Sequence, residues 1–409
     1  MRILTLISRC PWPLTDGAGI RDFSLLREAA KRHHVFLLCF LFRPSDRDYF
    51  CHLRPYCKEI VGIDLVRPRP TMLARAARNV FKNRPFITEE YRRKDMAMTL
   101  SRMVAERSID VIHAHFLHMS QYHPFKGRAA FVHDAHNLEH VLWKRMAQTA
   151  RNPLVRRFAA SQCPKLIRLQ QEVGLRSEKC VTLSDEDRIE YRRICPEADV
   201  STVPNGADIA YWKPSPNSSE ARSILYFGNL GWAPQADAAR FFHDAILPAI
   251  WERMPDAKLY IVGQNPPEFI QRLRGERVIV TGFVPDMRDY LGRATVVVMP
   301  LRIGAGTKHR VLQALAMQKA LVCTSVAAEG IDLMHGETAL ITDQPQEFAS
   351  YTLRLLQDPD LRAKLGTRGR KLILGRYDWQ NIYDRLEETF QEAHRRRHGH
   401  AARNGVGLR

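Results

Sequence analysis

The sequence lacks several features, and each absence excludes a class of protein. No apolar run approaches the roughly 18 residues that a membrane-spanning helix needs, and the longest, residues 35–42, predicts a buried strand. The first residues carry too short an apolar stretch for a secretory signal peptide, so we expect them to form the first strand. The eight cysteines are scattered, without a Cys-x-x-Cys pair or a histidine-rich cluster beside them. This pattern favours reduced thiols in the cytoplasm and argues against a zinc site.

The composition is that of an ordinary globular protein. Hydrophobic residues make up 45% and charged residues 26% of the 409 residues, which excludes a disordered or collagen-like chain. The chain is about two to four times as long as a typical domain, so we expect two domains.

Positive charge is concentrated in the first half of the chain. Residues 1–200 carry 35 Lys and Arg against 22 Asp and Glu, whereas residues 201–409 carry 27 against 22. A basic surface can attract nucleic acid, anionic lipid or a phosphorylated substrate, although excess arginine can also serve solubility alone. Nucleic acid is not an expected partner, because the cations are not interleaved with aromatic residues in a known binding module.

Apolar segments of strand length alternate with amphipathic segments along the whole chain. This alternation is typical of parallel sheets that are covered by helices on both faces. The stretch 205–222 is rich in Pro, Asn, Ser and Gly and predicts a linker. We expect strands at residues 2–8, 35–41, 59–65, 110–115, 129–134, 179–184 and 199–204, with helices at 20–32, 95–107 and 138–148, and further strands at 223–228, 257–263, 277–282, 295–300, 320–325 and 339–342.

The end of the chain is predicted to be helical. Residues 376–394 form a last long helix, and the basic tail 395–409 is predicted to be disordered. The predicted fold class is α/β, with two doubly wound Rossmann-like domains at residues 1–204 and 223–375. Such sheets bind ligands outside the carboxyl ends of their strands, so we expect the site in a cleft between the two domains.

The turn after the first strand, residues 10–21, is a candidate phosphate loop. Gly17 and Gly19 can adopt positive φ and let a ligand approach the backbone. A helix that begins near Ile20 would present free N–H groups there, and Arg21 could add a charge. A tight strand–helix turn explains the glycines equally well.

Histidines gather behind two neighbouring predicted strands. Asp134 and Asn137 suit a helix entry, but capping does not explain the histidines around them. A hydrogen-bonding or proton-relay role in a cleft is the better interpretation than metal binding, because no convincing carboxylate pattern accompanies them. The histidines are His113, His115, His133, His136 and His140.

The most specific segment is 299–330. A strand ends at Pro300, a Gly-x-Gly loop follows, and a helix is predicted to start near Thr307. Glycine backbone, a helix N-terminus and cations together suit a diphosphate, and Gln313 on the helix could bond a sugar hydroxyl. The glycines are Gly304 and Gly306, and the cations are Arg302, Lys308 and Arg310.

Several motifs together resemble the family-4 glycosyltransferases, most closely the sugar transferases of bacterial exopolysaccharide clusters. The resemblance covers the chain to about residue 394 and is strongest in the second half. It implies a GT-B fold, with an acceptor domain, a nucleotide-sugar domain and a last helix that crosses back to the first domain. The motifs are DGAGIR (16–21), DAHNLEH (134–140), VPNGAD (203–208), FGNLGWAPQADAARFF (227–242), PDAKLYIVG (255–263), residues 280–317 and RYDWQNI (376–382).

The resemblance also implies a reaction and its residues. The enzyme would retain the anomeric configuration, use no metal or other cofactor, and move a sugar from a nucleoside diphosphate to a glycan or lipid-linked acceptor. His136 would lie beside the transferred sugar, while Arg302 and Lys308 would stabilise the diphosphate leaving group. The remaining donor-binding residues would be Gly17, Gly19, Gly228, Asn229, Gly304, Gly306, Thr307, Arg310 and Gln313.

Two positions depart from the pattern of many relatives, which carry a pair of glutamates there. This chain has Ala305 and Gln313, and an amide is a poorer acceptor for vicinal hydroxyls than a carboxylate. A catalytically silent protein that binds a nucleotide sugar within a polysaccharide assembly complex is therefore the alternative function. A sugar-nucleotide epimerase of similar shape is the third possibility.

The segment 67–94 predicts contact with a membrane surface. It holds nine Lys and Arg against two Asp and Glu, and apolar residues recur at helical spacing between the cations. Such a helix can lie on anionic headgroups, or it can pack on the sheet with its arginines in water. Because a lipid-linked acceptor must be reached, we expect a cytoplasmic protein attached peripherally to the inner face of the plasma membrane. The apolar residues are Met72, Leu73, Ala76, Ala77, Val80 and Phe81, and the cations between them are Arg75, Arg78 and Lys82.

Overall fold

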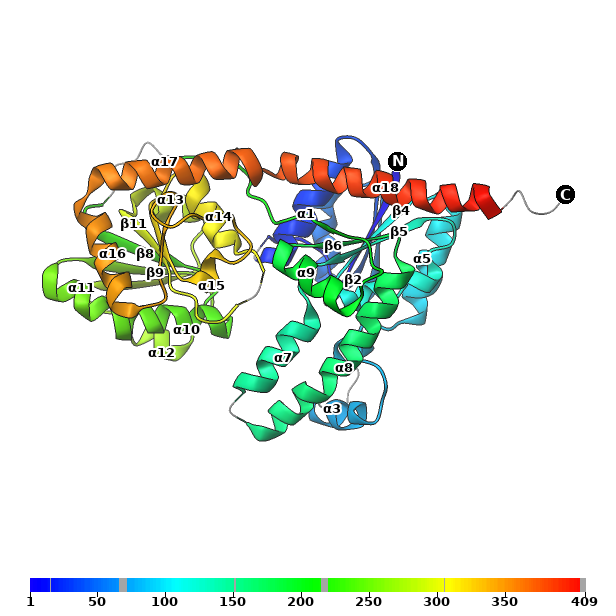
Figure 1. Cartoon of the computed structure of the whole chain (residues 1–409), viewed down its shortest axis with the longest axis horizontal. Coiled ribbons are helices and arrows are strands. Elements are labelled where there is room, and N and C mark those ends of the chain that lie inside the picture. The colour runs from blue at the N-terminus through cyan, green and yellow to red at the C-terminus, as the bar shows by residue number, and fades with distance from the viewer. Residues whose placement is uncertain (15, 66–71, 151, 215–219, 305, 405–409) are drawn as a thin grey trace. The chain divides into compact units, whose positions relative to one another are not determined.

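The computed structural model describes the whole chain except residues 15, 66–71, 151, 215–219, 305 and 405–409 (Figure 1). The chain forms two compact units. Unit 1 comprises Met1–Val203 and Tyr383–Arg409, and unit 2 comprises Pro204–Ile382. The centre of the predicted linker and position 305 therefore lie outside the described residues.

Unit 1 is built on a seven-stranded sheet with the order β3-β2-β1-β4-β5-β6-β7, in which all neighbours are parallel. The central strands are buried along their length because helices cover both faces. The strands are β1 (Arg2–Ile7), β2 (His34–Leu41), β3 (Glu59–Asp64), β4 (Val111–His115), β5 (Ala130–Ala135), β6 (Lys179–Thr182) and β7 (Val200–Thr202).

Unit 2 is built on a six-stranded parallel sheet with the order β10-β9-β8-β11-β12-β13. A single large apolar core fills its two faces. The strands are β8 (Ser223–Phe227), β9 (Lys258–Val262), β10 (Val278–Gly282), β11 (Val296–Met299), β12 (Leu321–Cys323) and β13 (Leu340–Ile341). Every predicted strand is present in one of the two sheets, so the α/β fold class is confirmed.

Each sheet has one point at which the strand order reverses. In unit 1 it lies between β1 and β4, and in unit 2 between β8 and β11. Crossovers on the two sides of such a point run to opposite faces, which leaves an opening at the carboxyl ends of the two strands. The segments that follow β1, β4, β8 and β11 are therefore the first to consider as ligand sites.

The helices of unit 1 cover its sheet, except for a pair that extends away from it. The pair, α7 and α8, lies beside α3 (Figure 1). The long α8 is not among the predicted helices, although Asn152, which caps its N-terminus, and the following Pro153 are typical start signals. The helices are α1 (Gly17–Ala30), α2 (Phe50–Leu53), α3 (Met72–Val80), α4 (Phe86–Glu89), α5 (Lys94–Glu106), α6 (Leu117–Ser120), α7 (Glu139–Thr149), α8 (Pro153–Arg176) and α9 (Asp185–Ile194).

Unit 2 has shorter helices between its strands and two longer ones after them. The helices are α10 (Ala233–Phe241), α11 (Leu247–Arg253), α12 (Glu268–Gln271), α13 (Met287–Arg293), α14 (His309–Ala316), α15 (Ser325–Ala328), α16 (Pro345–Gln357) and α17 (Pro359–Arg376).

The last helix, α18 (Trp379–Asn404), begins in unit 2 and belongs to unit 1 from Tyr383 onward. The predicted disorder after residue 394 is wrong as far as Asn404. Contacts with unit 1 hold this part of the helix, because Arg396 forms an ion pair with Asp199 and Arg397 donates a hydrogen bond to the Gly127 carbonyl at 2.7 Å. Residues 405–409 of the predicted tail lie outside the described residues.

Candidate functional site

The turn after β1 differs from its prediction. Gly17 and Gly19 lie in the first turn of α1, which begins three residues earlier than expected, and neither has positive φ. The reason is Asp16, whose carboxylate accepts a hydrogen bond of 3.0 Å from the Gly19 N–H and so caps the helix at Gly17. Asp16 also pairs with Arg9.

Gly19 is required for space rather than for an unusual backbone conformation. A Cβ atom at this position would lie 2.8 Å from the Pro11 carbonyl oxygen. Any side chain would therefore push the start of α1 away from the preceding turn. The N-terminus of α1 still faces the carboxyl edge of the sheet, as the phosphate-loop prediction requires, but the Gly19 N–H already bonds to Asp16.

A buried ion pair lies directly behind this turn. The Arg21 guanidinium donates hydrogen bonds of 2.8 and 3.2 Å to one carboxylate oxygen of Asp134, at the end of β5. Burial alone would raise the pKa of the Asp134 carboxyl, but Arg21 and the bond from His113 hold that pKa well below its ordinary value. Asp134 therefore stays ionised at neutral pH.

From Asp134 a chain of hydrogen bonds runs through the histidines that follow β4 and β5. Nε2 of His113 lies 3.2 Å from Oδ2 of Asp134, and Nε2 of His115 lies 2.9 Å from Nδ1 of His113. Nδ1 of His115 lies 2.6 Å from Oδ1 of Asp22 and 3.0 Å from Nε2 of His136. The predicted relay partners are thus in contact, and they end at the residue predicted to face the sugar.

The protonation states in this chain follow from burial. Burial lowers the pKa of His113 to about 4, and the neighbouring His115 acts in the same direction. Burial also holds the pKa of His136 well below its ordinary value. Both rings are therefore neutral at pH 7. The Nε2 hydrogen of His113 points to Asp134, so Nδ1 of His113 accepts from Nε2 of His115.

The other two histidines of the predicted group have separate partners. His133 lies 2.6 Å from the hydroxyl oxygen of Ser120, and His140 bonds to Gln170 and Glu190 at 2.8 and 3.0 Å. Both are buried and belong to the packing between β5, α7 and the helices behind them. They are not part of the chain that ends at His136.

Two overlapping groups in this cluster bring three potential metal ligands together. They are Asp22, His115 and His136, and His113, His115 and Asp134. The same atoms serve one another as hydrogen-bond partners, and Arg21 supplies positive charge to Asp134. These ligand atoms therefore already have hydrogen-bond partners within the protein, and metal independence stays a prediction.

In unit 2, β8 and β9 end on glycines that touch. A Cβ on Gly263 would lie 1.7 Å from the Gly228 carbonyl oxygen, and a Cβ on Gly228 would lie 2.2 Å from the Gln235 side chain. The carbonyl oxygen of the Asn229 side chain accepts a hydrogen bond of 3.2 Å from the Gly231 N–H. The predicted donor residues Gly228 and Asn229 thus lie in a tightly packed loop beside the strand reversal, where no larger side chain fits at Gly228.

The loop after β11 carries the predicted diphosphate residues. Gly306 has a φ of 66°, a left-handed conformation that favours glycine. Lys308 occupies the N-cap position of α14, which begins at His309 rather than near Thr307. The Lys308 ammonium group donates a hydrogen bond to the Gly306 carbonyl and lies 3.6 Å from the Glu329 carboxylate. Thr307 is buried, with its hydroxyl 3.4 Å from the Gly330 carbonyl oxygen.

The remaining cations of this loop have protein partners as well. Arg302 is half-exposed, forms an ion pair of 2.6 Å with Asp237 on α10, and stacks on Phe241. Arg310 donates a hydrogen bond of 2.9 Å to the side-chain oxygen of the buried Gln313. Arg302 faces α10, so its role at a phosphate stays a prediction with less support than that of Lys308.

Sequence reasoning missed three residues that organise these sites. Asp16, Asp22 and Asp237 are the acidic partners of Arg9, His115 and Arg302. The sequence pattern could have identified Asp16, because this residue precedes the glycines at a position typical of a helix cap. No local pattern could have identified Asp22 and Asp237, because each pairs with a residue more than 60 positions away.

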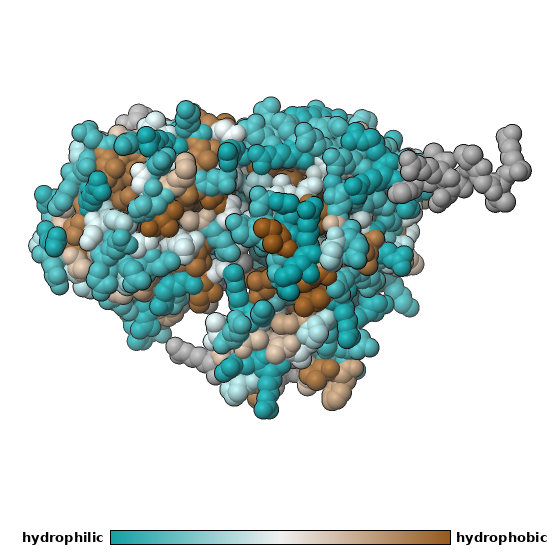
Figure 2. All heavy atoms as spheres, viewed as in Figure 1, coloured by the Kyte–Doolittle hydropathy of each residue, from teal (hydrophilic) through white to brown (hydrophobic). Residues whose placement is uncertain are grey.

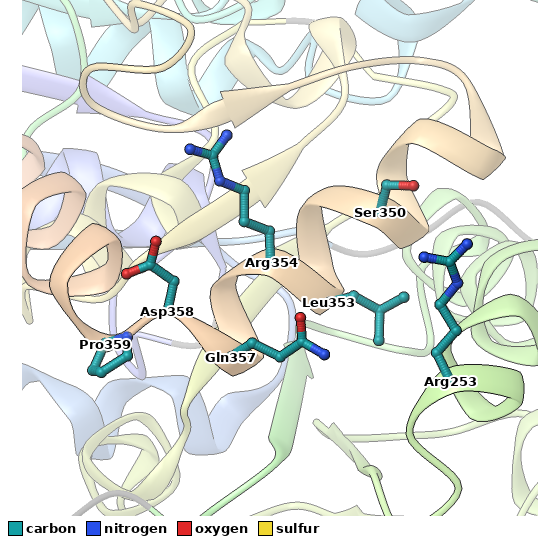
Figure 3. A pocket seen from close by; sticks show the side chains of 7 residues that line it. All are labelled: Arg253, Ser350, Leu353, Arg354, Gln357, Asp358 and Pro359. Carbon is teal, nitrogen blue, oxygen red and sulfur yellow. The ribbon is translucent and has the colours of Figure 1, made fainter.

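A hollow of about 380 Å³ in unit 2 lies away from these sites (Figure 3). It is lined by the end of α11 and by the turn between α16 and α17, including Arg253, Arg354 and Asp358. Helix α11 ends just before β9 begins, so this hollow is at the amino edge of the sheet. Ligands of such sheets bind at the opposite edge, and we assign it no role.

The comparisons with known proteins agree with the geometry. Residues 15–211 match the family described as Glycosyltransferase Family 4, and residues 221–358 match the one described as Glycosyl transferases group 1. Together with the two parallel sheets, these matches show that the chain belongs to the family-4 glycosyltransferases, a retaining family with the GT-B fold.

Individual relatives are distant in sequence. A phosphatidyl-myo-inositol mannosyltransferase from Mycolicibacterium smegmatis is 23% identical over 205 residues, which are 47% of this chain and 52% of that protein. The chain spans about half the length of the curated relatives it matches.

Solved structures resemble the chain over nearly its whole length. Sucrose-phosphate synthase from Thermosynechococcus elongatus has a TM-score of 0.70 at 18% identity, covering 96% of this chain and 99% of that one. The Anabaena protein HepE in complex with UDP-glucose has a TM-score of 0.64 at 15% identity, with the same coverage. At these identities the likeness shows the fold alone.

Proposed function

We propose that the protein transfers a sugar from a nucleoside diphosphate to a glycan or lipid-linked acceptor, in the synthesis of exopolysaccharide or another cell-surface polysaccharide. The observation that carries the proposal is the loop after β11, where Lys308, Gly306 and the N-terminus of α14 meet. A cation, glycine backbone and the positive end of a helix at one strand end are the chemistry that suits a diphosphate. The UDP-glucose bound to HepE supports the choice of donor class.

Lys308 has the clearest role in this proposal. The leaving nucleoside diphosphate takes up negative charge as the glycosidic bond breaks, and preorganised cations and dipoles stabilise that charge. The Lys308 side chain is only 10% exposed, and its contacts with Gly306 and Glu329 fix its position before the donor arrives. The positive end of α14 adds to the same field.

In unit 1, His136 is the residue we propose to face the sugar. It is neutral at pH 7, so it can hydrogen-bond to a hydroxyl group without adding charge. His115 and Asp22 hold its Nε2 side, at 3.0 and 3.3 Å. We propose that these two act as positioning residues and that no metal or other cofactor takes part.

Activity is tested by incubating the full chain with a panel of UDP-, GDP- and dTDP-sugars plus membrane extract, with and without EDTA. We expect nucleotide release and incorporation of label into glycan or lipid for at least one donor, unchanged by EDTA. If none of the donors gave nucleotide release, that result would contradict the proposal. Loss of transfer in EDTA would contradict metal independence alone.

A second candidate is a catalytically silent member that binds nucleotide sugar within a polysaccharide assembly complex. Gln313 favours it, because the amide is buried and already bonded to Arg310, whereas many relatives present a carboxylate there. Binding of UDP-sugars without transfer to any acceptor would support this function over the first.

We further propose that the protein works peripherally on the cytoplasmic face of the plasma membrane. Among the described residues no helix has the length and apolarity to cross a bilayer. The part of unit 1 formed by α3, α7 and α8 exposes large apolar side chains among hydrophilic ones (Figure 2). Phe81, after α3, is 92% exposed, and Leu154, at the start of α8, is 73% exposed.

The basic segment differs in detail from the surface helix that the sequence predicts. Arg75 stacks on Phe86 and lies 3.9 Å from the Glu90 carboxylate, and Lys82 pairs with Glu89 at 3.0 Å. Arg78 and Arg84 are exposed, as are Val80 and Phe81. The side chains of Met72 and Leu73 lie outside the described ones. An exposed aromatic residue flanked by cations supports insertion into an anionic interface.

A further inference from the structure

Phe116, directly after β4, has a strained backbone. Its φ of 66° and ψ of 153° lie outside the regions that a bulky side chain adopts readily. The centroid of its ring lies 4.0 Å from that of the His136 ring, and the two ring planes are tilted by 31°. Strain of this kind persists only where neighbouring groups hold it, and it collects at functional sites. The groups that hold Phe116 therefore also determine what the His136 ring packs against.

Three hydrogen bonds fix the backbone on both sides of Phe116. Its N–H donates to the Asp134 carbonyl at 2.8 Å, and its own carbonyl accepts from the Ser120 N–H at 3.0 Å. The next N–H along the chain, that of Leu117, donates to Oε1 of Glu139 at 3.3 Å. The first two bonds join backbone to backbone and follow from the fold. The third depends on a single side chain.

Glu139, the first residue of α7, is a deeply buried carboxyl group. It is 4% exposed, and its second carboxylate oxygen has no hydrogen-bond partner among the described residues. Packing does not favour such a group, because a buried polar atom without a partner opposes folding. Burial raises the pKa of Glu139 to about 7, so the neutral acid is populated at physiological pH. Its Oε1 can still accept the bond from Leu117 in that form.

We propose that Glu139 is a positioning residue for His136, the residue proposed to face the sugar. The bond from the Leu117 N–H to Glu139 keeps Phe116 in its strained conformation. The Phe116 ring in turn packs on one face of the His136 imidazole. The hydrogen bonds described above fix the Nε2 edge of that imidazole, and Phe116 fixes its plane. The opposite nitrogen then keeps one direction toward a sugar hydroxyl. The inference rests on the proposed transferase function.

Histidine side-chain NMR tests this contact without any need for catalysis. In full-length protein labelled with ¹³C on histidine, an aromatic ring stacked at 4.0 Å shifts the ring protons of His136 upfield. The signal that disappears in His136→Gln assigns them, and Phe116→Leu gives their position without the ring. We expect Glu139→Leu to move the His136 signals toward that position. Glu139→Gln should leave them in place, because the amide oxygen can accept the same hydrogen bond.

The kinetics of sugar transfer test the consequence for the reaction. Glu139→Leu should lower kcat about ten- to hundredfold, because a misplacement of about 1 Å can cost a hundredfold in rate. The KM of the nucleotide sugar should stay near the wild-type value, since the diphosphate loop belongs to unit 2 and Glu139 to unit 1. Glu139→Gln should restore most of kcat. The matched control is Glu190→Leu, whose carboxylate bonds instead to the neighbouring His140 at 3.0 Å. It should change neither kcat nor the His136 signals.

His136 signals that do not move in Glu139→Leu would overturn the inference, and so would a wild-type kcat in that variant. A loss of activity in Glu139→Gln as large as in Glu139→Leu would also count against it. If the wild-type chain transferred no sugar, the transferase proposal would fail, while the NMR comparison would still decide whether Glu139 holds His136 in place. Melting temperatures identify a misfolded variant, and Glu139→Ala then replaces Glu139→Leu.

Discussion

Arg21 and Asp134 lie 113 positions apart in the chain, yet the guanidinium of one meets the carboxylate of the other at 2.8 Å with side chains 1% and 0% exposed. This pair ties the start of α1 to the end of β5. It thereby fixes the turn behind β1 and the chain of hydrogen bonds that leads to His136.

Breaking the pair should be costly. Asp134→Asn leaves the Arg21 charge buried without its partner, which we expect to lower the free energy of unfolding by about 3–5 kcal/mol. Chemical denaturation monitored by fluorescence measures the loss. Asp64→Asn is the control, since Asp64 pairs with Arg47 at 3.0 Å on the surface, and exposed pairs contribute about 1 kcal/mol or less. Equal midpoints for the two variants would refute the structural role of the pair.

Stability should fall on acidification below pH 6.5. Burial holds the pKa values of His113 and His133 at about 4 and that of His118 at about 3. Below the unfolded pKa of roughly 6.5 the unfolded chain takes up protons that the folded chain does not. Each such histidine then costs about 1.4 kcal/mol per pH unit. Burial raises the pKa of Glu139 to about 7, so this residue increases the free energy of unfolding as the pH falls. The three histidines together have the larger, opposite effect.

His118→Leu provides the check on this pH dependence. Removing one buried neutral histidine should flatten the fall in unfolding free energy between pH 6.5 and 4.5. Denaturation series at several pH values measure the slope. A slope as steep as that of the wild type would mean that His118 does not stay neutral in the folded protein.

Lys308→Ala should weaken binding of UDP about ten- to hundredfold, because a charge-assisted hydrogen bond is worth about 1.5–3 kcal/mol. Arg302→Ala is the matched comparison on the same loop. Because Arg302 is already paired with Asp237, we expect a smaller loss there. Isothermal titration calorimetry with UDP measures both. Unaltered affinity in both variants would remove the diphosphate site from this loop.

Gln313→Glu should tighten nucleotide binding up to about tenfold if this position faces the ribose, since charge-assisted hydrogen bonds are about twice as strong as neutral ones. The new carboxylate would also accept from Arg310, which now bonds to the amide oxygen at 2.9 Å. Gln357→Glu, at the end of α16, is the control. Weaker binding of UDP by Gln313→Glu would show that the glutamine is suited to this donor or lies away from the ribose.

Membrane attachment should depend on Phe81 and the exposed cations beside it. The combined change Phe81→Ser, Arg78→Glu and Arg84→Glu avoids Arg75 and Lys82, which have partners within unit 1. Each cation near an anionic surface contributes roughly 1 kcal/mol, so the variant should leave vesicles containing phosphatidylglycerol. Co-sedimentation at low and high salt measures this. The control is Lys364→Glu with Lys371→Glu, an exposed pair of unit 2, which should stay bound.

No co-sedimentation of the wild-type protein, or co-sedimentation unaffected by the triple change and by high salt, would contradict the membrane proposal. It would leave the donor-site proposal untouched.

The sequence by itself determined the two sheets of this protein. Most strands are short segments rich in apolar residues between turn residues, so local information is enough to locate β1 to β13 and to predict that they are parallel. The loop after β11 is equally local, because Gly306, Lys308 and the start of α14 lie within four residues of one another.

Only the tertiary structure decided which side chains meet. Asp22 and His115, 93 positions apart, lie 2.6 Å from each other because β1 and β4 are neighbours at the strand reversal. The last helix continues to Asn404 because Arg396 and Arg397 find partners on unit 1. Hydrogen bonds and ion pairs between distant residues depend on which elements become neighbours in space, and no local pattern of residues encodes that choice.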